Sequence, residues 1–284
     1  MKLMTINTHS LIEAQYETKR AQLAEFLLRE QPDLIAMQEV NQSVDAPLAE
    51  PELEQGFCPC AGQPVPLRQD NHAAQIARLL RQGGLHPQWT WLPAKLGYGK
   101  YDEGLALLSL RRPITAVDAF RISRCDDYGN WKTRWTLGAQ VGGDWYYTVH
   151  MGWWADEEEP FEAQWHTLDH RLHLQKDAGR VWLLGDFNSP AEVRGQGYDC
   201  VRSAGWQDTF LLAQETDCGV TVEGVIDGWR DRFQEPPDGM RIDQIWCSES
   251  LPVIDSRVVL NGRNGPVVSD HFGVMITYKG ENPS

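Results

Sequence analysis

The chain has 284 residues, of which 42% are hydrophobic and 23% are charged, and this length suits one large domain or two small ones. Its 26 Lys and Arg against 40 Asp and Glu give a net charge of −14. Because duplex nucleic acid is held largely by Lys and Arg, this charge disfavours a nucleic-acid partner, although an acidic chain can still carry a local basic groove.

Neither a membrane span nor a disulfide framework is indicated. No apolar run approaches the ~20 residues of a transmembrane helix, and the first residues form a strand-like pattern and not a signal-peptide core. The six cysteines are too sparse for a disulfide scaffold. We expect a cytoplasmic protein with no membrane partner and with reduced thiols, a disulfide at Cys58 or Cys60 being the lesser alternative.

The first elements form a strand–helix–strand unit. Residues 3–8 read as a buried strand, residues 13–30 as a helix with one apolar face, and residues 33–38 as a second short strand. This spacing suits a crossover unit in a layered α/β domain. The polar stretch 41–69 is long for a loop, so we weigh a functional loop and a solvated insertion equally.

The remainder mixes strands with a few helices. No composition break or internal repeat interrupts it, so we expect one catalytic domain over 1–284. The patterns predict helices over 72–81 and 161–176, and strands over 88–92, 104–110, 136–141, 145–150, 181–185, 241–247, 253–259 and 272–278.

Polar residues stand where several apolar strands end. Glu39 closes the second strand, and after the next apolar run Gly185 permits a tight turn from which Asp186 and Asn188 project together. An Asx turn after a strand is an equally good explanation of the latter pair.

A second group of polar residues lies near the C-terminus. Asp243 stands in the opening segment of one expected strand, and Asp270 and His271 directly precede another. A carboxylate beside an imidazole fixes its tautomer and stabilises its charged form. Each fragment alone is weak evidence of function, but their joint occurrence at strand ends indicates a functional site.

These fragments resemble, in order, the motif set of the endonuclease/exonuclease/phosphatase superfamily, which includes abasic-site endonucleases, deoxyribonuclease I, sphingomyelinases and inositol phosphatases. The resemblance spans about residues 2–278. Its motifs are Asn7, Gln38-Glu39, Val149-His150, Gly185-Asp186-Phe187-Asn188, Arg241-Ile242-Asp243 and Ser269-Asp270-His271. One departure is Val149, where the superfamily often has Thr.

The stretches around these motifs are similar to bacterial maltose 6′-phosphate phosphatases. They are Asn7-Thr8-His9-Ser10, Gln38-Glu39-Val40-Asn41-Gln42, Tyr101-Asp102-Glu103-Gly104, Trp131-Lys132-Thr133-Arg134, His150-Met151-Gly152-Trp153-Trp154 and Ile226-Asp227-Gly228-Trp229.

The resemblance implies a four-layer α-β-β-α sandwich, with two mixed β-sheets between outer helices and the site at one edge. Glu39 would be the principal Mg²⁺ ligand, with Asn7 and Asp270 near the ion, and Mn²⁺ could substitute for Mg²⁺. This suits a hard cation that takes few protein carboxylates and leaves positions for water and phosphate.

The resemblance also implies roles in hydrolysis. Asp186 would orient or deprotonate the attacking water, and Asn188 would hold that water or a phosphate oxygen. His150 and His271, the latter oriented by Asp243, would donate to phosphate oxygens as charge develops. We expect direct in-line attack by water without a covalent nucleophile.

Several residues bear on the substrate. Arg134 could fork onto the phosphate, and Trp153 or Trp154 could stack on a sugar face. The acidic run 156–159 reads as a solvated helix start, with a fixed charge cluster that repels polyanions as the lesser alternative.

We therefore expect a phosphomonoesterase acting on a small sugar phosphate, foremost maltose 6′-phosphate. The alternatives are a phosphodiesterase or nuclease using the same site, and a binding module that has lost activity. The oligomeric state is not readable from the sequence.

Overall fold

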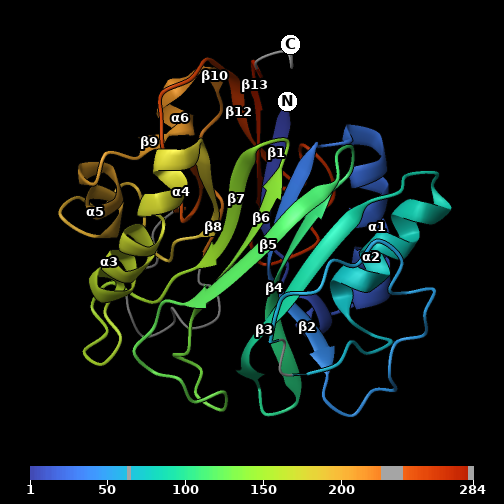
Figure 1. Ribbon diagram of the computed structural model, residues 1–284. Coiled ribbons are helices and arrows are strands. Elements are labelled where there is room, and N and C mark those ends of the chain that lie inside the picture. Colours follow the sequence, from blue (N-terminus) through green and yellow to red (C-terminus); the bar gives the residue numbers. More distant parts are fainter. Residues whose placement is uncertain (63–64, 225–238, 281–284) are drawn as a thin grey trace.

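The computed structural model describes residues 1–62, 65–224 and 239–280, and in it two β-sheets pack face to face between outer helices (Figure 1). The first sheet contains β1 (Lys2–Asn7), β2 (Leu34–Ser43), β3 (Gln88–Gly97), β4 (Tyr101–Ser109), β10 (Ala213–Thr216), β12 (Val253–Val259) and β13 (Gly273–Tyr278). The second contains β5 (Ile114–Arg121), β6 (Trp135–Val141), β7 (Asp144–His150), β8 (Val181–Asp186), β9 (Gln207–Asp208) and β11 (Asp243–Cys247).

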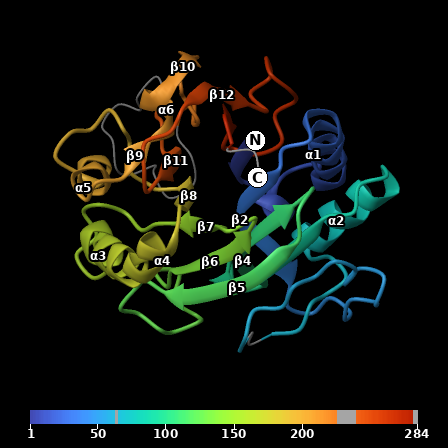
Figure 2. The same cartoon turned by 45° about the horizontal axis from the view of Figure 1, so that its top comes forward.

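The helices lie outside the two sheets, as Figure 2 shows from another side. They are the 3-10 helix Ser10–Ile12, α1 (Tyr16–Glu30), α2 (His72–Gln82), α3 (Phe161–Arg171), α4 (His173–Ala178), α5 (Gly197–Ser203) and α6 (Thr209–Leu212). This arrangement confirms the expected α-β-β-α sandwich.

Both sheets are mixed. The first has the strand order β10-β12-β13-β1-β2-β4-β3, in which β1 runs parallel to β2 and antiparallel to β13. The second has the order β5-β6-β7-β8-β11-β9, in which β8 runs parallel to β7 and antiparallel to β11. The β1–β2 connection through α1 is the crossover unit that the sequence predicts.

The central strands contain apolar runs because both of their faces are buried. Along β2, Leu34 and Ala36 pack between the sheets, whereas Ile35 and Met37 face the core beneath the outer helices α1 and α2. The side chains of β8 alternate in the same way, with Trp182 among those between the sheets. Successive side chains of a strand point to opposite faces, so each run supplies two cores at once.

Several sequence-based expectations about elements need correction. The short elements β9, β10, α5 and α6 were not predicted, and the strand predicted over 88–92 extends to Gly97. The strand predicted to end near Glu39 continues to Ser43. The single helix predicted over 161–176 is divided at Leu172, a fully buried residue whose non-helical backbone separates α3 from α4. The strand β5 was not predicted, because as a partly exposed edge strand it lacks a buried apolar run.

Within the described part of the chain, no helix is both long and apolar enough to cross a membrane. All six cysteines are free thiols, including the closely spaced Cys58 and Cys60. Of the polar stretch 41–69, the first three residues belong to β2, and the bridge between Leu48 and Arg68 brings its two arms together.

The β7–β8 contact gives a test of the fold. A Cβ added at Gly185 would collide with the backbone carbonyl of Val149 on β7, whereas one added at Gly179 would meet nothing closer than 3.7 Å. We expect Gly185→Ala to lower the free energy of unfolding by about 1–3 kcal/mol, as overpacking does. Gly179→Ala is the matched control and should change it by much less. Denaturant unfolding measures both, and equal stabilities would contradict this packing.

Candidate active site

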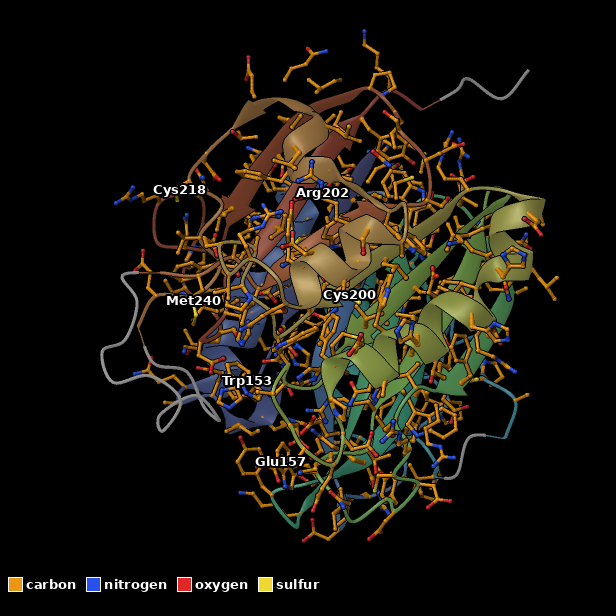
Figure 3. The ribbon with its side chains drawn as sticks, turned by 90° about the vertical axis from the view of Figure 1, so that its left-hand side faces the viewer. Trp153, Glu157, Cys200, Arg202, Cys218 and Met240 are labelled. Carbon is orange, nitrogen blue, oxygen red and sulfur yellow. The ribbon has the colours of Figure 1, made fainter. Side chains whose placement is uncertain are left out.

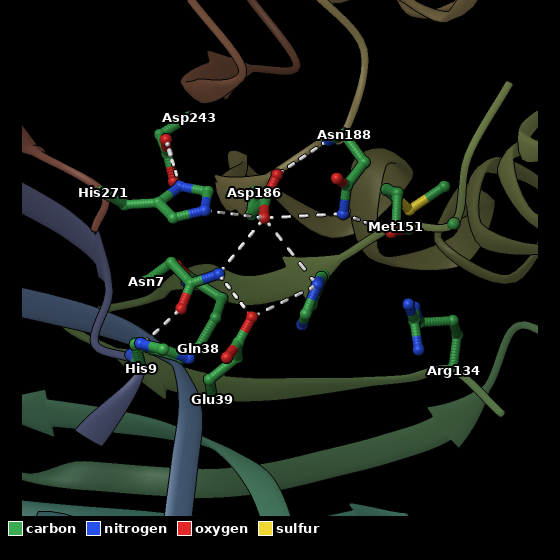
Figure 4. Close-up of polar contacts among 12 residues, drawn as sticks. Asn7, His9, Gln38, Glu39, Arg134, Met151, Asp186, Asn188, Asp243 and His271 are labelled. Atoms are coloured by element: carbon green, nitrogen blue, oxygen red, sulfur yellow. Dashed lines mark hydrogen bonds and ion pairs between the residues drawn. The ribbon is translucent and has the colours of Figure 1, made fainter. Parts of the chain in front are cut away.

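Strand register gathers the polar strand-end residues of the second sheet into one row. His150 at the end of β7 pairs with Asp186 at the end of β8, and Asp243 at the start of β11 pairs with Asp186 from the other side. In the first sheet Asn7 pairs with Gln38 on β2. Because these ends meet at one edge of the sandwich, residues far apart in sequence converge there (Figure 4).

Glu39 reaches this edge from a β-bulge and not from a strand end. The pairing of β2 with β4 is irregular between Met37 and Val40, and Glu39 has a φ of 52°. The hydroxyls of Thr8 and Ser10 both donate to the Glu39 carbonyl oxygen, at 3.2 and 2.7 Å. Bulges re-aim side chains next to active sites, and here the bulge presents a half-buried carboxylate to the cluster.

The Asp186 carboxylate is the centre of the cluster and is only 1% exposed. The Asn7 side-chain amide donates to Asp186 Oδ2 at 3.2 Å and to Glu39 Oε1 at 2.9 Å. The backbone N–H of Asn188 donates to Asp186 Oδ1 at 2.8 Å, and its side-chain amide donates to the Met151 carbonyl at 2.9 Å. Donors from β1 and from the segment after β8 thus hold this carboxylate (Figure 4).

Two histidines lie close to Asp186, His150 at the end of β7 and His271 just before β13. His150 Nε2 lies 3.7 Å from Asp186 Oδ2, and His271 Nε2 lies 3.9 Å from the same oxygen. His271 Nδ1 forms a 2.9 Å hydrogen bond with Asp243 Oδ2. Asp243 is fully buried, so this contact fixes the ring.

The surroundings give these groups different protonation states. Burial alone would lower the pKa of His271, but the carboxylates of Asp243 and Asp186 outweigh it and raise that pKa to about 10. Burial and the nearby cation Arg134 hold the pKa of His150 well below its usual range. Burial raises the pKa of Asp186 to about 7, opposed by His271. Near neutral pH the site therefore contains one charged and one neutral imidazole.

The donor set fits a hard divalent cation. Glu39 Oε1 lies near Asn7 and Asp186, and carboxylate and amide oxygens are the ligands such an ion prefers. The Asn7 amide turns its nitrogen toward the carboxylates, while its oxygen accepts from the backbone N–H of His9 at 3.2 Å. Asn7 therefore orients the Glu39 carboxylate, and in this arrangement its own amide oxygen is turned away from the cluster.

Asp270 lies at the margin of the cluster. Its Oδ1 is 3.7 Å from His9 Nδ1, which in turn forms a 2.8 Å hydrogen bond with Glu13 Oε1. These three residues could also hold a metal ion by their spacing. However, Lys19 pairs with Glu13, and although burial opposes it, the acidic neighbours raise the pKa of His9 to about 9. Two cations therefore already balance the two carboxylates.

The expected substrate-binding residues differ in exposure. Arg134 is 7% exposed, lies beside the cluster in Figure 4, and donates from Nη1 to the Trp131 carbonyl at 2.6 Å. Trp153 is half-buried against the small core cluster that contains Met240 (Figure 3), and Trp154 packs on Phe161. The indole of Trp131, by contrast, is 55% exposed.

The acidic run 156–159 is not a solvated helix start. Helix α3 begins only at Phe161, and Asp156 accepts from the backbone N–H groups of Glu158 and Glu159, at 3.0 and 2.8 Å. The buried Glu159 accepts from two backbone N–H groups of the loop that precedes Trp131. The run is a turn that anchors this loop, and unsatisfied backbone donors explain why one of its acids is buried.

Sequence reasoning missed Lys95 on β3 and Glu103 on β4, which form a buried 3.0 Å ion pair next to Arg134. Charged residues in a strand are seldom buried unless paired, but both residues lie outside the predicted strands 88–92 and 104–110, so no predicted strand contained this signal. The stretch Ile226-Asp227-Gly228-Trp229 lies outside the described residues.

Comparison with known proteins identifies the family of the chain. The sequence profile of the endonuclease/exonuclease/phosphatase family matches residues 4–271. The chain belongs to the endonuclease/exonuclease/phosphatase family. Members of this family are metal-dependent phosphoric ester hydrolases, which confirms the enzyme class expected from the sequence. No curated protein matches the chain in sequence.

Solved structures of this family share the fold. An endonuclease/exonuclease/phosphatase family protein from Leptotrichia buccalis is 28% identical, with a TM-score of 0.84 over 99% of this chain and 100% of that one. A mannosyl-6-phosphatase from Bacteroides thetaiotaomicron is 15% identical, with a TM-score of 0.63 over 99% and 100%. A 3′ phosphatase from Neisseria bound to a product DNA hairpin is 19% identical, with a TM-score of 0.60 over 99% and 100%.

The ion pair of His271 with Asp243 gives a pH-dependent prediction. Because the folded pKa of His271 lies above its ordinary value of 6.5, the stabilisation is complete below pH 6.5 and is lost as the pH rises through about 10. In Asp243→Asn we expect the pKa of His271 to fall by several units, and the protein to lose about 3–5 kcal/mol below pH 6.5, as when one partner of a buried pair is removed.

Histidine NMR titration of both proteins measures this shift. The signal of His166, which lies on the exposed surface of α3, should not differ between them and serves as the internal control. An unchanged His271 titration in the variant would contradict the assignment.

Proposed function

We propose that this protein is a Mg²⁺-dependent phosphomonoesterase that releases phosphate from a phosphorylated sugar, foremost maltose 6′-phosphate. The observation that carries the proposal is the convergence of Glu39, Asp186 and two differently protonated imidazoles at one edge of the sandwich. A phosphoryl transfer site needs positioning groups and positive charge more than it needs a covalent nucleophile.

Glu39 would hold the ion, with Asn7 and Asp270 close by, and Mn²⁺ could replace Mg²⁺. When bound, such an ion neutralises phosphate charge and stabilises the leaving oxygen. Asn7 keeps the Glu39 carboxylate in place through its 2.9 Å hydrogen bond.

Asp186 would orient the attacking water and accept its proton. Its pKa of about 7 makes it a competent base near neutral pH, and Asn188 would hold the water or a phosphate oxygen. The backbone N–H of Asn188 fixes one Asp186 oxygen, which leaves the other directed toward the histidines.

The two histidines would act as donors to phosphate oxygens. His271, kept protonated by Asp243, supplies a positive charge that stabilises the developing charge of the transition state. His150 remains neutral and donates one hydrogen bond without adding charge. Arg134 would fork onto the phosphate from the other side of the site.

Four features favour a sugar monoester. The chain carries a net charge of −14, and the nearby cation Lys132 is already paired with Asp156 and Glu158, at 2.9 and 2.8 Å. The stretches quoted above are similar to maltose 6′-phosphate phosphatases, and the Bacteroides neighbour is named a mannosyl-6-phosphatase. The second candidate is a nuclease or phosphodiesterase, favoured by a structural neighbour named a 3′-5′ exonuclease.

Phosphate release from a substrate panel tests the proposal. The panel contains maltose 6′-phosphate, trehalose 6-phosphate, glucose 6-phosphate, a nucleoside monophosphate, a bis-aryl phosphodiester and supercoiled plasmid, each with and without Mg²⁺. We expect metal-dependent release from a disaccharide phosphate, reduced at least ~1,000-fold in Asp186→Ala because the base is removed. Diester or plasmid cleavage without sugar-phosphate turnover would favour the nuclease.

Metal binding by Glu39 gives a separate prediction. In Glu39→Gln the carboxylate charge is lost but the shape is kept, so we expect the Mg²⁺ concentration for half-maximal activity to rise by at least about tenfold. Glu157→Gln, a surface substitution in the acidic turn (Figure 3), is the control and should leave it unchanged. If the Glu39→Gln protein kept full activity at low Mg²⁺, Glu39 would not be a metal ligand.

The sugar contact can be assigned by comparing tryptophans. Trp131 is the most exposed tryptophan near the site, so Trp131→Ala should raise KM for maltose 6′-phosphate up to about tenfold, the scale found when a stacking ring is lost. Trp131→Phe keeps an aromatic ring and should retain most of the wild-type affinity. Leu174→Ala, at an exposed apolar residue on α4, is the control and should leave KM unchanged. If Trp153→Ala or Trp154→Ala raises KM instead, the sugar lies on that side.

A further inference from the structure

Lys95, Glu103 and Arg134 form a buried charge cluster beside the proposed catalytic groups. They come from β3, from β4 and from the segment before β6, and are 7%, 6% and 7% exposed. Lys95 Nζ lies 3.0 Å from Glu103 Oε1. Lys95 Nζ and Arg134 Nη1 both donate to the Trp131 carbonyl, at 3.2 and 2.6 Å, so one backbone oxygen joins the two cations.

The cluster contains more positive than negative charge. Among the described residues, no carboxylate lies within 4.0 Å of the Arg134 guanidinium, and its buried Nε–H has no hydrogen-bond acceptor. Arg134 therefore makes its direct polar contacts with carbonyl oxygens, whereas Glu103 forms its ion pair with Lys95 and acts on the guanidinium, as Glu39 does, only from a longer distance. A buried cation with no anion in direct contact is costly, which favours a bound anion as the missing contact.

The two cations of the cluster line a cavity together with His150, one of the proposed catalytic residues. Lys95, Arg134 and His150 line one small cavity, together with Thr133 and Trp135. Both cations help to lower the pKa of His150, and the negative charge of Glu39 acts to raise the pKa of each cation. An anion that contacts His150 in this cavity would therefore meet two cations.

We propose that Lys95 and Arg134 form a subsite for a doubly negative phosphate group, and that Lys95 makes the site prefer a monoester dianion over a diester monoanion. This inference rests on the proposed function and adds to it the feature that separates the two substrate classes. A monoester carries one more negative charge and one more free oxygen than a diester, and the second cation is matched to that difference. Glu103 is a positioning residue that holds Lys95 before substrate arrives.

The alternative is that Lys95 and Glu103 only join β3 to β4. The two interpretations differ in whether removal of Lys95 changes discrimination between anions of different charge. Phosphate at pH 8 is a dianion and dimethyl phosphate is a monoanion with the same tetrahedral core, so these two anions are the probes.

Calorimetric titration of each anion into the Mg²⁺-containing protein measures the effect. In Lys95→Met we expect phosphate affinity to fall at least tenfold and dimethyl phosphate affinity to change less than about twofold, while Lys95→Arg keeps most of the preference. Lys100→Met, an exposed lysine at the β3–β4 turn, is the matched control and should change neither. Equal losses for both anions, or no loss, in a folded Lys95→Met protein would overturn the inference.

A double variant covers the case in which Lys95→Met does not fold. Lys95→Met with Glu103→Gln removes both charges and leaves no unpaired carboxylate, and it should show the same selective loss of phosphate binding. The ratio of kcat/KM for an aryl monoester to that for a bis-aryl diester should fall in parallel. If the wild-type protein hydrolyses monoesters but this ratio is unchanged in the variant, only the Lys95 subsite fails. If the wild-type protein hydrolyses no monoester, the proposed function itself fails.

Discussion

The need to satisfy one buried carboxylate governs the active-site edge of this molecule. Asp186 ends a central strand with almost no exposure, and a buried charge is tolerated only where donors and opposite charges surround it. The donors are the side-chain amide of Asn7 on the first sheet and the backbone N–H of Asn188 after β8, and the opposite charge is that of His271, 3.9 Å away. The two sheets must therefore pack in one relative position for the site to form.

The other charges around each ring explain why two histidines at similar distances from Asp186 behave differently. His271 has Asp243 as a second anionic partner and remains protonated, whereas His150 faces Arg134 and Lys95 and remains neutral. Positive charge is thus delivered to the site from two directions, by His271 on one side and by the Lys95–Arg134 cluster on the other. A phosphate group bound between them would meet complementary charge on both sides.

The sequence predicted most of the central strands, and singled out polar residues that the structure brings together, for one physical reason. A strand buried on both faces is apolar, so a polar residue at its end is conspicuous, and this singled out Asp186, Asp243 and His271. Glu39 was found, but its bulge was not, because an irregular pairing depends on the partner strand β4. Lys95 and Glu103 were missed because their pairing joins neighbouring strands and leaves no local pattern. The tryptophans show a further limit, since a ring's exposure depends on what the fold packs against it.

The location of the metal and the phosphate tests the central claim most directly. Crystals grown with Mn²⁺ and inorganic phosphate, measured at the manganese absorption edge, would show both. The account predicts that the anomalous peak marks a manganese ion bound by a Glu39 oxygen, with the phosphate in contact with His150 and Arg134. Manganese held by His9, Glu13 and Asp270 without Glu39, or phosphate bound away from His150, would contradict it.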